Sequence, residues 1–449
     1  MSRIIRALKT VNYRLWAAIL LMMFIPIIYQ TVRIFFLGDM PGDWGFNIAS
    51  QLSWVNLFYE VIQEAFILPL FFLLGKSLNN KAELENKIRS GLIVVAVVYL
   101  AMSSFLAIFA NPLVVFMAQE GTLVDATVTY IRLETVAALF STLWRFMLIV
   151  FVISEKEKYM YIALSIQMVL SILLDTFLLS GLKFSANMGV NGIAITNMIT
   201  NSVVLCFAGV ILYKEDIKLF RRKKLCFKWM KEWVKIGKFS GMESFLRNFA
   251  FMIMIIRMVN VVAEQGNYWV ANNFIWGWLL LPGLALGELV KREIGVNEKN
   301  IREKTFGYIC LVSIFAVVWL ATIPLWQPFL KNVMNVDEYQ TVFYIVLIQT
   351  GFYITFLFNS CIFDSTFYGL GKTNYMLIQS VCIDVLYYGI MFILYMTNVF
   401  VPTLLGISLM FGIGMVLDFI PTMILYRYLL KKKGIKIDFK LDGNSIKNL

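Results

Sequence analysis

The composition of this 449-residue chain argues against a soluble protein. It is 60% hydrophobic and only 15% charged, and its mean hydropathy is +0.75. A soluble domain averages roughly 45–50% apolar and about 25% charged residues. The apolar content is sufficient for about a dozen membrane-spanning helices of about 20 residues each. A soluble enzyme, a nucleic-acid-binding protein and a disordered scaffold are therefore all disfavoured, despite a formal net charge of +12.

Residue types that carry metal and histidine chemistry are scarce. The sequence has no His, and its five Cys are scattered without paired spacing. Neither a disulfide framework nor a zinc site is indicated. Without His, proton transfer near neutral pH would have to use carboxyl groups whose pKa values are shifted toward neutral pH. We expect no metal, no cofactor, no catalytic residue and no enzymatic activity.

Twelve apolar stretches follow one another along the chain, and each is about 20 residues or longer. Their length and the lack of strict alternation favour helices over strands. The sequence predicts an all-α integral membrane protein with spans at 15–37, 49–75, 90–118, 127–153, 159–181, 188–213, 239–262, 268–290, 306–328, 339–368, 376–397 and 401–430.

The Lys and Arg residues predict the orientation of these spans. Of the 40 Lys and Arg, 33 lie in the tails and in alternate loops, whereas the opposite loops hold only Lys183 and Lys331. Positive charge marks the cytoplasmic side of a membrane protein. We expect a multi-pass plasma-membrane protein with both termini in the cytoplasm. The net charge is explained without nucleic acid.

The longest loop, 214–238, divides the spans into two sets of six. Its ten Lys and Arg, with Trp229 and Trp233, suggest a basic amphipathic linker on the anionic inner leaflet. The expected domains are an N-lobe (1–213), this linker, a C-lobe (239–430) and a basic cytoplasmic tail (431–449).

An internal repeat supports two pseudo-symmetric six-helix bundles. When the second half is shifted back by 216 residues, six identities appear at the junctions of spans 4–5 and 10–11. They pair Lys156, Tyr159, Met160, Ile162, Val169 and Leu170 with Lys372, Tyr375, Met376, Ile378, Val385 and Leu386. Transporters are often built from such repeats.

Four segments, taken in order, resemble the multidrug and toxic compound extrusion (MATE) family. They are PIIYQTVRIFFLGDM in span one, LDTFLLSGLKFSANMGVNGIAIT in spans five and six, KIGKFSGMESFLRNF in span seven and TFYGLGKTNYM after span ten. The resemblance covers about residues 14–430. It implies export of organic solutes by alternating access, in exchange for Na⁺ or H⁺.

The resemblance also implies a coupling-ion site in the N-lobe. The acidic position of span five falls on Asp175, its polar neighbour on Ser171, and the hydroxyl of span six on Thr196. Arg33 stands where the family has an acid in span one, and Arg247 stands near an acidic position in span seven. These two positions depart from the family pattern.

Other charged and polar residues inside the spans are candidates to line a cavity, because a charge at mid-bilayer costs at least about 2.5–3.5 kcal/mol. Glu60 and Glu64 lie four residues apart and share one helix face. Either they share a proton, or partner helices or water satisfy both carboxylates. Glu243 and Arg247 have the same spacing and suggest a local pair. Among the C-lobe acids Asp384 ranks first, with Gln379 and Tyr387 on the same polar stripe.

Three further expectations concern single residues. Tyr29 and Gln30 are expected to line the cavity beside Arg33. Glu134 is expected to pair with Arg132 or Arg145, and Glu288 is expected to form an ion pair at the membrane interface.

Arg33 and Asp175 lie at similar depths, since each is a few residues from the outer end of its span. A guanidinium and a carboxylate form a strong, often bidentate pair. We hypothesise that the two side chains meet and that Arg33 holds Asp175 ionised. The other reading places Arg33 at the outer interface.

Two functions remain open. The first is a MATE-type efflux antiporter for organic solutes or drugs, driven by H⁺ or Na⁺, acting as a monomer in the bilayer. The alternative is a lipid-linked oligosaccharide flippase or an organic-anion exporter of the same superfamily, with Arg33 and Arg247 binding the anion. Twelve spans favour the first function, and two intramembrane arginines favour the second.

The predicted topology is testable by labelling. Single cysteines near residues 44, 184 and 334 should react with a membrane-impermeant thiol reagent added to intact cells. Cysteines near residues 80, 225 and 440 should react only after the cells are opened. Labelling of position 225 from outside would contradict the orientation derived from the loop charges.

Overall fold

The fold is taken from a computed structural model of the chain. The structure describes residues 2–40, 44–75, 77, 80–154, 156–215, 217 and 224–437. These residues form helices, turns and loops, and the described ranges contain no β-strand. Position 440, one of the labelling sites above, lies outside them.

The contacts group the chain into two compact units. Unit 2 is Ile28–Val270 with Asn332–Asp337. It holds the second part of α2 (Tyr13–Gly38), then α3 (Trp44–Ala49), α4 (Leu52–Ile62), η1 (Gln63–Ile67), α5 (Leu70–Gly75), α6 (Lys81–Ile108), α7 (Ala110–Phe116), η2 (Gly121–Leu123), α8 (Val124–Ile153), α9 (Glu157–Leu178), α10 (Val190–Lys214), α11 (Met230–Phe251), η3 (Met252–Ile256), α12 (Arg257–Val261) and the first part of α13 (Gln265–Phe274).

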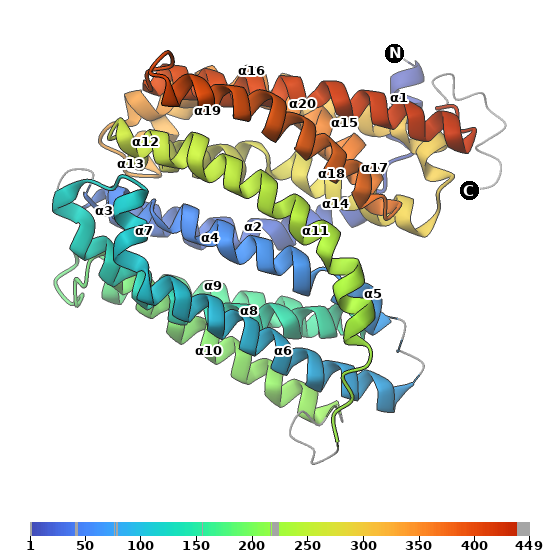
Figure 1. Ribbon diagram of the computed structural model, residues 1–449, viewed down its shortest axis with the longest axis horizontal. Helices are drawn as coiled ribbons and strands as arrows, with labels where there is room; N and C mark the ends of the chain where they lie inside the picture. The colour runs from blue at the N-terminus through green and yellow to red at the C-terminus, as the bar shows by residue number, and fades with distance from the viewer. Residues whose placement is uncertain are drawn as a thin grey trace. The chain divides into compact units, whose positions relative to one another are not determined.

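Unit 1 is Met1–Ile27, Ala271–Lys331 and Glu338–Leu449. Its helices are α1 (Ser2–Leu8), the first part of α2, the end of α13, η4 (Ile275–Leu279), α14 (Leu281–Val296), α15 (Asn300–Asn332), α16 (Tyr339–Phe358), η5 (Asn359–Asp364), α17 (Ser365–Gly369), α18 (Thr373–Val381), η6 (Cys382–Tyr388), α19 (Gly389–Met396) and α20 (Leu404–Lys433). Within unit 1, α16 packs along α20 (Figure 1).

The predicted spans are present as helices. Ten helical segments of the described chain are long and apolar enough to cross a membrane, and a pair bent by 57° at Leu280 makes an eleventh. The bend is explained by Pro282 in the first turn of α14, because proline has no N–H to continue the ladder of the preceding helix. The remaining expected span, 49–75, runs through α4, η1 and α5. The all-α membrane fold is confirmed.

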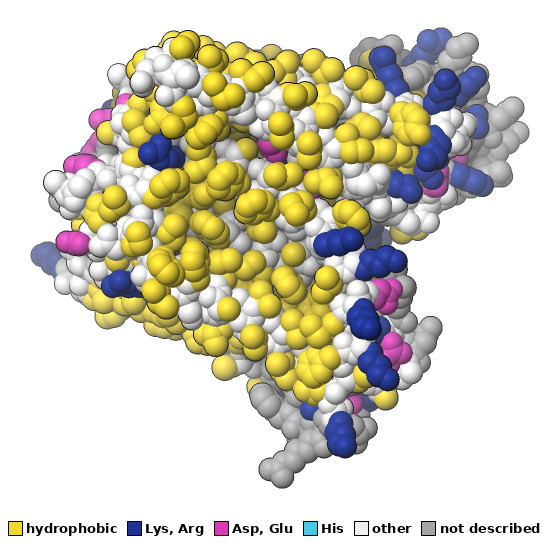
Figure 2. Space-filling model, in the orientation of Figure 1, with side chains coloured by type: hydrophobic (Ala, Val, Ile, Leu, Met, Phe, Trp, Pro, Cys, Tyr) yellow, Lys and Arg dark blue, Asp and Glu magenta, His cyan; other side chains and the backbone are white. Residues whose placement is uncertain are grey.

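The surfaces of these helices suit a lipid environment. On α6, Val97 and Leu100 are 61% and 53% exposed. Figure 2 shows hydrophobic side chains over most of the face in view, with most Lys and Arg side chains near helix ends. A contiguous apolar surface of this kind marks a membrane-contacting protein.

Within unit 2, α11 packs closely against η1. A Cβ added to Gly237 would lie 1.9 Å from the backbone oxygen of Ala65, and one added to Gly241 would lie 2.8 Å from the Ala65 Cβ. Two glycines four residues apart thus form a groove that admits the backbone of η1. Small residues at this spacing are a common means of close helix packing in membranes.

Side chains of α11 also satisfy backbone oxygens of η1, which is a π-helical turn. The hydroxyl of Ser240 donates to the oxygen of Glu64 at 2.8 Å, and Trp233 Nε1 donates to the oxygen of Phe66 at 2.8 Å. A π-turn disturbs the regular i→i−4 ladder. In lipid, a freed oxygen must find another donor within the protein.

These contacts place α11 in unit 2, although its sequence was expected in the second lobe. The boundaries of the two units fall between Ile27 and Ile28, one residue after Pro26, and between Val270 and Ala271. They do not fall in the linker 214–238. The expected lobes, 1–213 and 239–430, are defined as the parts of the chain that move as units during transport. They stay a prediction.

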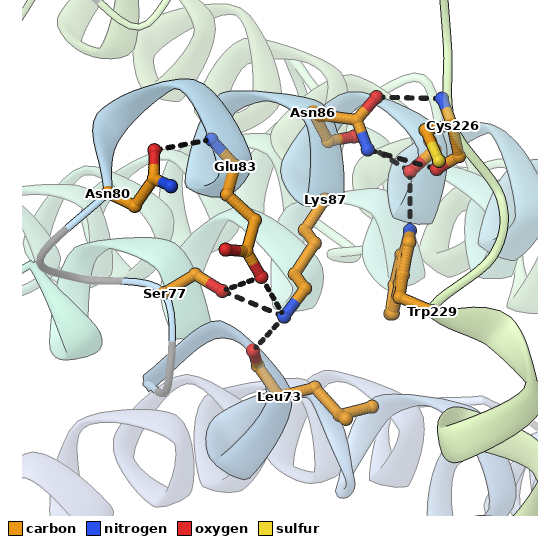
Figure 3. Close-up of polar contacts among 9 residues, drawn as sticks. Leu73, Ser77, Asn80, Glu83, Asn86, Lys87, Cys226 and Trp229 are labelled. Carbon is orange, nitrogen blue, oxygen red and sulfur yellow. Dashed lines mark hydrogen bonds and ion pairs between the residues drawn. The ribbon is translucent and has the colours of Figure 1, made fainter.

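The described end of the linker docks on α6, as Figure 3 shows. The side chain of Asn86 makes two hydrogen bonds of 2.9 Å with the backbone N–H and oxygen of Cys226. Trp229 Nε1 donates to Ser90 Oγ at 3.0 Å. Trp233 is only 1% exposed, so its expected position in the lipid leaflet is wrong: the ring stacks on Trp229 with centroids 4.7 Å apart.

A buried lysine fastens the neighbouring helix ends. Lys87 is 5% exposed, and its ammonium donates to the oxygen of Leu73 at 3.1 Å and to Ser77 Oγ at 2.7 Å (Figure 3). It also forms an ion pair with Glu83 at 2.9 Å. A cation near a helix C-terminus interacts favourably with the helix dipole. Lys87 is therefore a positive charge of this region that holds neighbouring helix ends together.

Exposure refines the labelling sites. Trp44 and Phe184 are 39% and 63% exposed, but Met334 is 1% exposed. Val333, at 44%, is the better position for a reporter cysteine in that loop.

The close packing of α11 on η1 predicts a strong response to one methyl group. Gly237→Ala should lower the unfolding midpoint of the detergent-purified protein, because its Cβ meets a backbone atom; overpacking costs about 1–3 kcal/mol or more. Gly209→Ala is the matched control, since nothing lies within 4 Å of its Cβ. It should be neutral or stabilise the helix by up to about 1 kcal/mol. Equal midpoints for the two variants would contradict the packing.

Candidate functional site

A polar cluster lies inside unit 2, in helices whose other residues are mostly apolar. It consists of Arg33 from α2, Glu134 from α8, Asp175 from α9 and Asn197 from α10, and is called the cationic-bridge cluster below. Asp175 is 0% and Glu134 5% exposed, and the side chain of Arg33 is 12% exposed. Ionisable groups at such depth in a membrane protein are costly and usually functional.

Arg33 and Asp175 form the salt bridge that the sequence suggested. Arg33 Nε donates to Asp175 Oδ2 at 2.9 Å, and Arg33 Nη2 donates to Oδ1 at 3.3 Å. Both carboxylate oxygens therefore face the guanidinium fork, the bidentate geometry that gives the strongest ion pairs. The hypothesis that the two residues meet is confirmed.

Asn197 extends the salt bridge to Glu134. Its Oδ1 accepts a hydrogen bond from Arg33 Nη2 at 3.1 Å, and its Nδ2 donates to Glu134 Oε1 at 2.8 Å. The amide joins a cation on one side to a carboxyl group on the other. Sequence reasoning did not predict the role of Asn197, because an asparagine in a span shows nothing about the helix it faces.

The expected local partners of Glu134 are wrong. Arg132 Nε donates to the backbone oxygen of Ala107, and Arg145 donates to Gln63. Residues two apart on a helix point to different faces, which separates Arg132 from Glu134. Arg145 is eleven residues away, or about 16 Å along the helix axis.

The other predicted residues of this region lie on the same helices. Ser171, one turn before Asp175, is 2% exposed, and Thr196, beside Asn197, is 0% exposed; the Thr196 hydroxyl makes no hydrogen bond. Tyr29 lies one turn before Arg33 and interacts electrostatically with it and with Asp175. Gln30, next along the helix, is exposed. Nothing in the structure assigns a ligand to these four residues.

A second charged group joins α4 and α11. Arg247 Nε donates to Glu243 Oε1 at 3.1 Å, which is the local pair predicted from spacing. Arg247 Nη2 also contacts Glu60 Oε1 at 3.1 Å, so Glu60 has a cationic partner from another helix. The π-turn η1 begins at Gln63, so Glu60 precedes it and Glu64 lies within it. A proton shared between Glu60 and Glu64 stays a prediction.

This second group is accessible. The side chains of Arg247 and Glu60 are 45% and 37% exposed, although both lie inside predicted spans. A charge facing lipid is strongly unfavourable, and intramembrane charges normally face a bundle interior or a water-filled cavity. We therefore expect water, not lipid, around these two side chains.

In unit 1, Gln379 contacts a second acid of the C-lobe, Asp418. Asp418 Oδ2 accepts hydrogen bonds from Asn359 Nδ2 and Gln379 Nε2, each at 2.9 Å. Tyr387 donates instead to the backbone oxygen of Met410 at 2.8 Å. Asp384 and Tyr387 lie in the π-helical turn η6, which changes the side-chain register after residue 381. The first rank of Asp384 among the C-lobe acids stays a prediction.

Solved structures with the same fold are MATE transporters. An inward-facing conformation of a multidrug resistance MATE family transporter of the MOP superfamily has a TM-score of 0.75 and 14% identity, covering 94% of this chain and 99% of that chain. The MATE transporter VcmN of Vibrio cholerae, in its bent form, has a TM-score of 0.67 and 13% identity, with 96% and 99% covered.

A third match is a MOP superfamily transporter from Pyrococcus furiosus, whose binding pocket is described as having reverse polarity. Its TM-score is 0.65 at 16% identity, with 96% of this chain and 95% of that chain covered. No protein-family model matches the sequence, and no curated protein matches it. The chain therefore has the fold of MATE transporters over nearly its whole length.

The buried salt bridge predicts strong non-additivity. Arg33→Met and Asp175→Asn should each destabilise the protein by about 3–5 kcal/mol, because each leaves a buried charge without its partner. The double variant should recover a large part of the loss caused by Arg33→Met. Unfolding of the purified protein measures both effects, with the exposed Arg132→Met as control. Simple additivity would contradict an energetic coupling between the two residues.

Proposed function

We propose that this chain is a secondary active transporter of the MATE type, which exports organic solutes by alternating access in exchange for H⁺ or Na⁺. The fold it shares with MATE transporters, over nearly the full length of both chains, supports transport rather than catalysis. Unit 2 also carries buried ionisable groups from three helices, joined by an asparagine from a fourth.

The observation that carries the proposal is the cationic-bridge cluster. Three ionisable side chains inside a membrane fold cost free energy, so they persist where transport uses them. Both oxygens of Asp175 are occupied by Arg33. Arg33 thus takes the place that a Na⁺ ion would need beside this carboxylate. This arrangement favours H⁺ as the coupling ion over Na⁺ at this site.

The alternative function requires arginines that are available to an anion. Arg33 is neutralised by Asp175 at 2.9 Å, and Arg247 contacts two carboxylates, those of Glu60 and Glu243. Both charged groups contain more carboxylates than guanidinium ions. A lipid-linked diphosphate or an organic anion is therefore disfavoured relative to a cationic or neutral organic solute, including drugs and other xenobiotics.

The remaining features of the proposal follow from the sequence. The loop charges support a multi-pass protein of the plasma membrane with both termini in the cytoplasm. The proposed exporter is a monomer in the bilayer. It binds a small organic substrate, needs no cofactor beyond the coupling ion and takes no nucleic acid.

Transport into everted membrane vesicles tests the proposal, with ethidium as the cationic probe and carboxyfluorescein as the anionic probe. An acidic vesicle lumen should drive ethidium accumulation, because the lumen corresponds to the cell exterior and H⁺ leaves it as ethidium enters. An imposed Na⁺ gradient should have little effect. Vesicles without the protein provide the background. Gradient-dependent accumulation of carboxyfluorescein alone would support the anion-exporting alternative.

A further inference from the structure

The cationic-bridge cluster is not balanced in charge if all its groups are ionised. Arg33 carries one positive charge, and Asp175 and Glu134 carry two negative charges between them. Arginine stays protonated in proteins, so only a carboxyl group can remove the excess. A net charge buried at this depth is strongly unfavourable, and a buried carboxyl group commonly becomes neutral by binding a proton.

Geometry distinguishes the two carboxyl groups. Asp175 accepts two hydrogen bonds from the guanidinium, at 2.9 and 3.3 Å, which stabilises its charged form. Glu134 accepts a hydrogen bond at 2.8 Å from the neutral amide of Asn197 and forms a second hydrogen bond with the neutral hydroxyl of Tyr130, so it touches no cation directly. Its contact with the positive charge is thus relayed through Asn197.

The direction of the Asn197 amide follows from the same contacts. Arg33 has only donors, so the atom of Asn197 that faces it must be the oxygen. The NH₂ group therefore faces Glu134, whose Oε1 must accept from it. The hydroxyl of Tyr130, the other hydrogen-bond partner of Glu134, can donate or accept. A Glu134 that carries a hydrogen on Oε2 is therefore compatible with both hydrogen bonds.

The surroundings of Glu134 come from several helices. Arg33 of α2 and Asp175 of α9 act on it electrostatically, and Tyr130 lies one turn earlier on α8. Tyr59 of α4 also interacts with its charge. Among these groups Arg33 is the one cation, and it already holds Asp175.

We propose that Glu134 is the proton-carrying residue of this transporter, whereas Arg33 and Asp175 stay ionised throughout the cycle. In the release step the O–H bond at Glu134 Oε2 breaks, and the proton passes to a water molecule. In the uptake step a hydronium ion returns a proton to the same oxygen. This proposal rests on the proposed ion-coupled function and deepens it by assigning the coupling residue.

The assignment explains how a proton and a cationic solute exclude each other. With Glu134 protonated, the cluster is neutral and offers no attraction to a cation. With Glu134 deprotonated, the cluster carries one net negative charge, which favours a nearby cation. A proton and a cationic substrate thus compete for the same charge state, as antiport requires.

Infrared spectroscopy of the purified protein tests the proton-carrying role without any substrate. Difference spectra between mildly acidic and mildly alkaline pH should show loss of a carboxylic-acid C=O band in the wild type. This band should be absent in Glu134→Gln and shifted in Glu134→Asp, which keeps an acid and controls for misfolding. Glu288→Gln is the matched control: Glu288 pairs with Lys291 at 2.6 Å outside the cluster. A spectrum of Glu134→Gln identical to that of the wild type overturns the proposal.

A transport measurement separates this inference from the proposed function. In everted vesicles, Glu134→Gln should lose ethidium accumulation driven by an acidic lumen and keep ethidium exchange without a gradient. Glu288→Gln should retain both. If Glu134→Gln keeps pH-driven accumulation, the assignment of Glu134 fails while ion-coupled export stands. If the wild type does not transport ethidium, the proposed substrate class fails, and the infrared result alone decides the role of Glu134.

Discussion

The salt bridge between Arg33 and Asp175 is the interaction on which the interior of unit 2 depends. It joins α2 to α9 through two hydrogen bonds between buried side chains. A charge cannot remain uncompensated there without a large cost. Arg33 Nη2 also donates to the Asn197 oxygen, which fixes the orientation of the Asn197 amide. The Asn197 NH₂ group then donates to Glu134. One ion pair thus determines the arrangement of four helices.

The same constraint organises the other charges inside the protein. Arg247 lies between Glu60 and Glu243. Lys87 is surrounded by a backbone oxygen, a hydroxyl and a carboxylate. Arg33, Arg247 and Lys87 therefore each have a carboxylate partner within unit 2. What distinguishes the cationic-bridge cluster is its surplus carboxyl group, and a surplus of that kind is the simplest basis for binding and releasing a proton.

Departures from regular helical geometry occur in both units. Five π-helical turns occur in the described chain: η1, η3, η4, η5 and η6. Such turns are frequent at functional sites and rotate the side chains that follow them. At η1 the backbone oxygens are satisfied by Ser240 and Trp233, and the glycines of α11 permit the close approach. The helix that sequence order assigns to the second half is thereby packed into unit 2.

The membrane class and the helical spans could be predicted from the amino-acid sequence, because they follow from local hydrophobicity. The orientation expected from loop charge stays a prediction. The sequence also predicted the contact of Arg33 with Asp175, because depth in a bilayer can be counted along a helix. The tertiary structure decided the partners that depend on which faces of different helices meet. It replaced the expected neighbours of Glu134 by Asn197, gave Glu60 a cation from α11, and brought Gln379 to Asp418. Regular spacing could not reveal these contacts, because helix rotation and π-turns are set by packing between segments far apart in the chain.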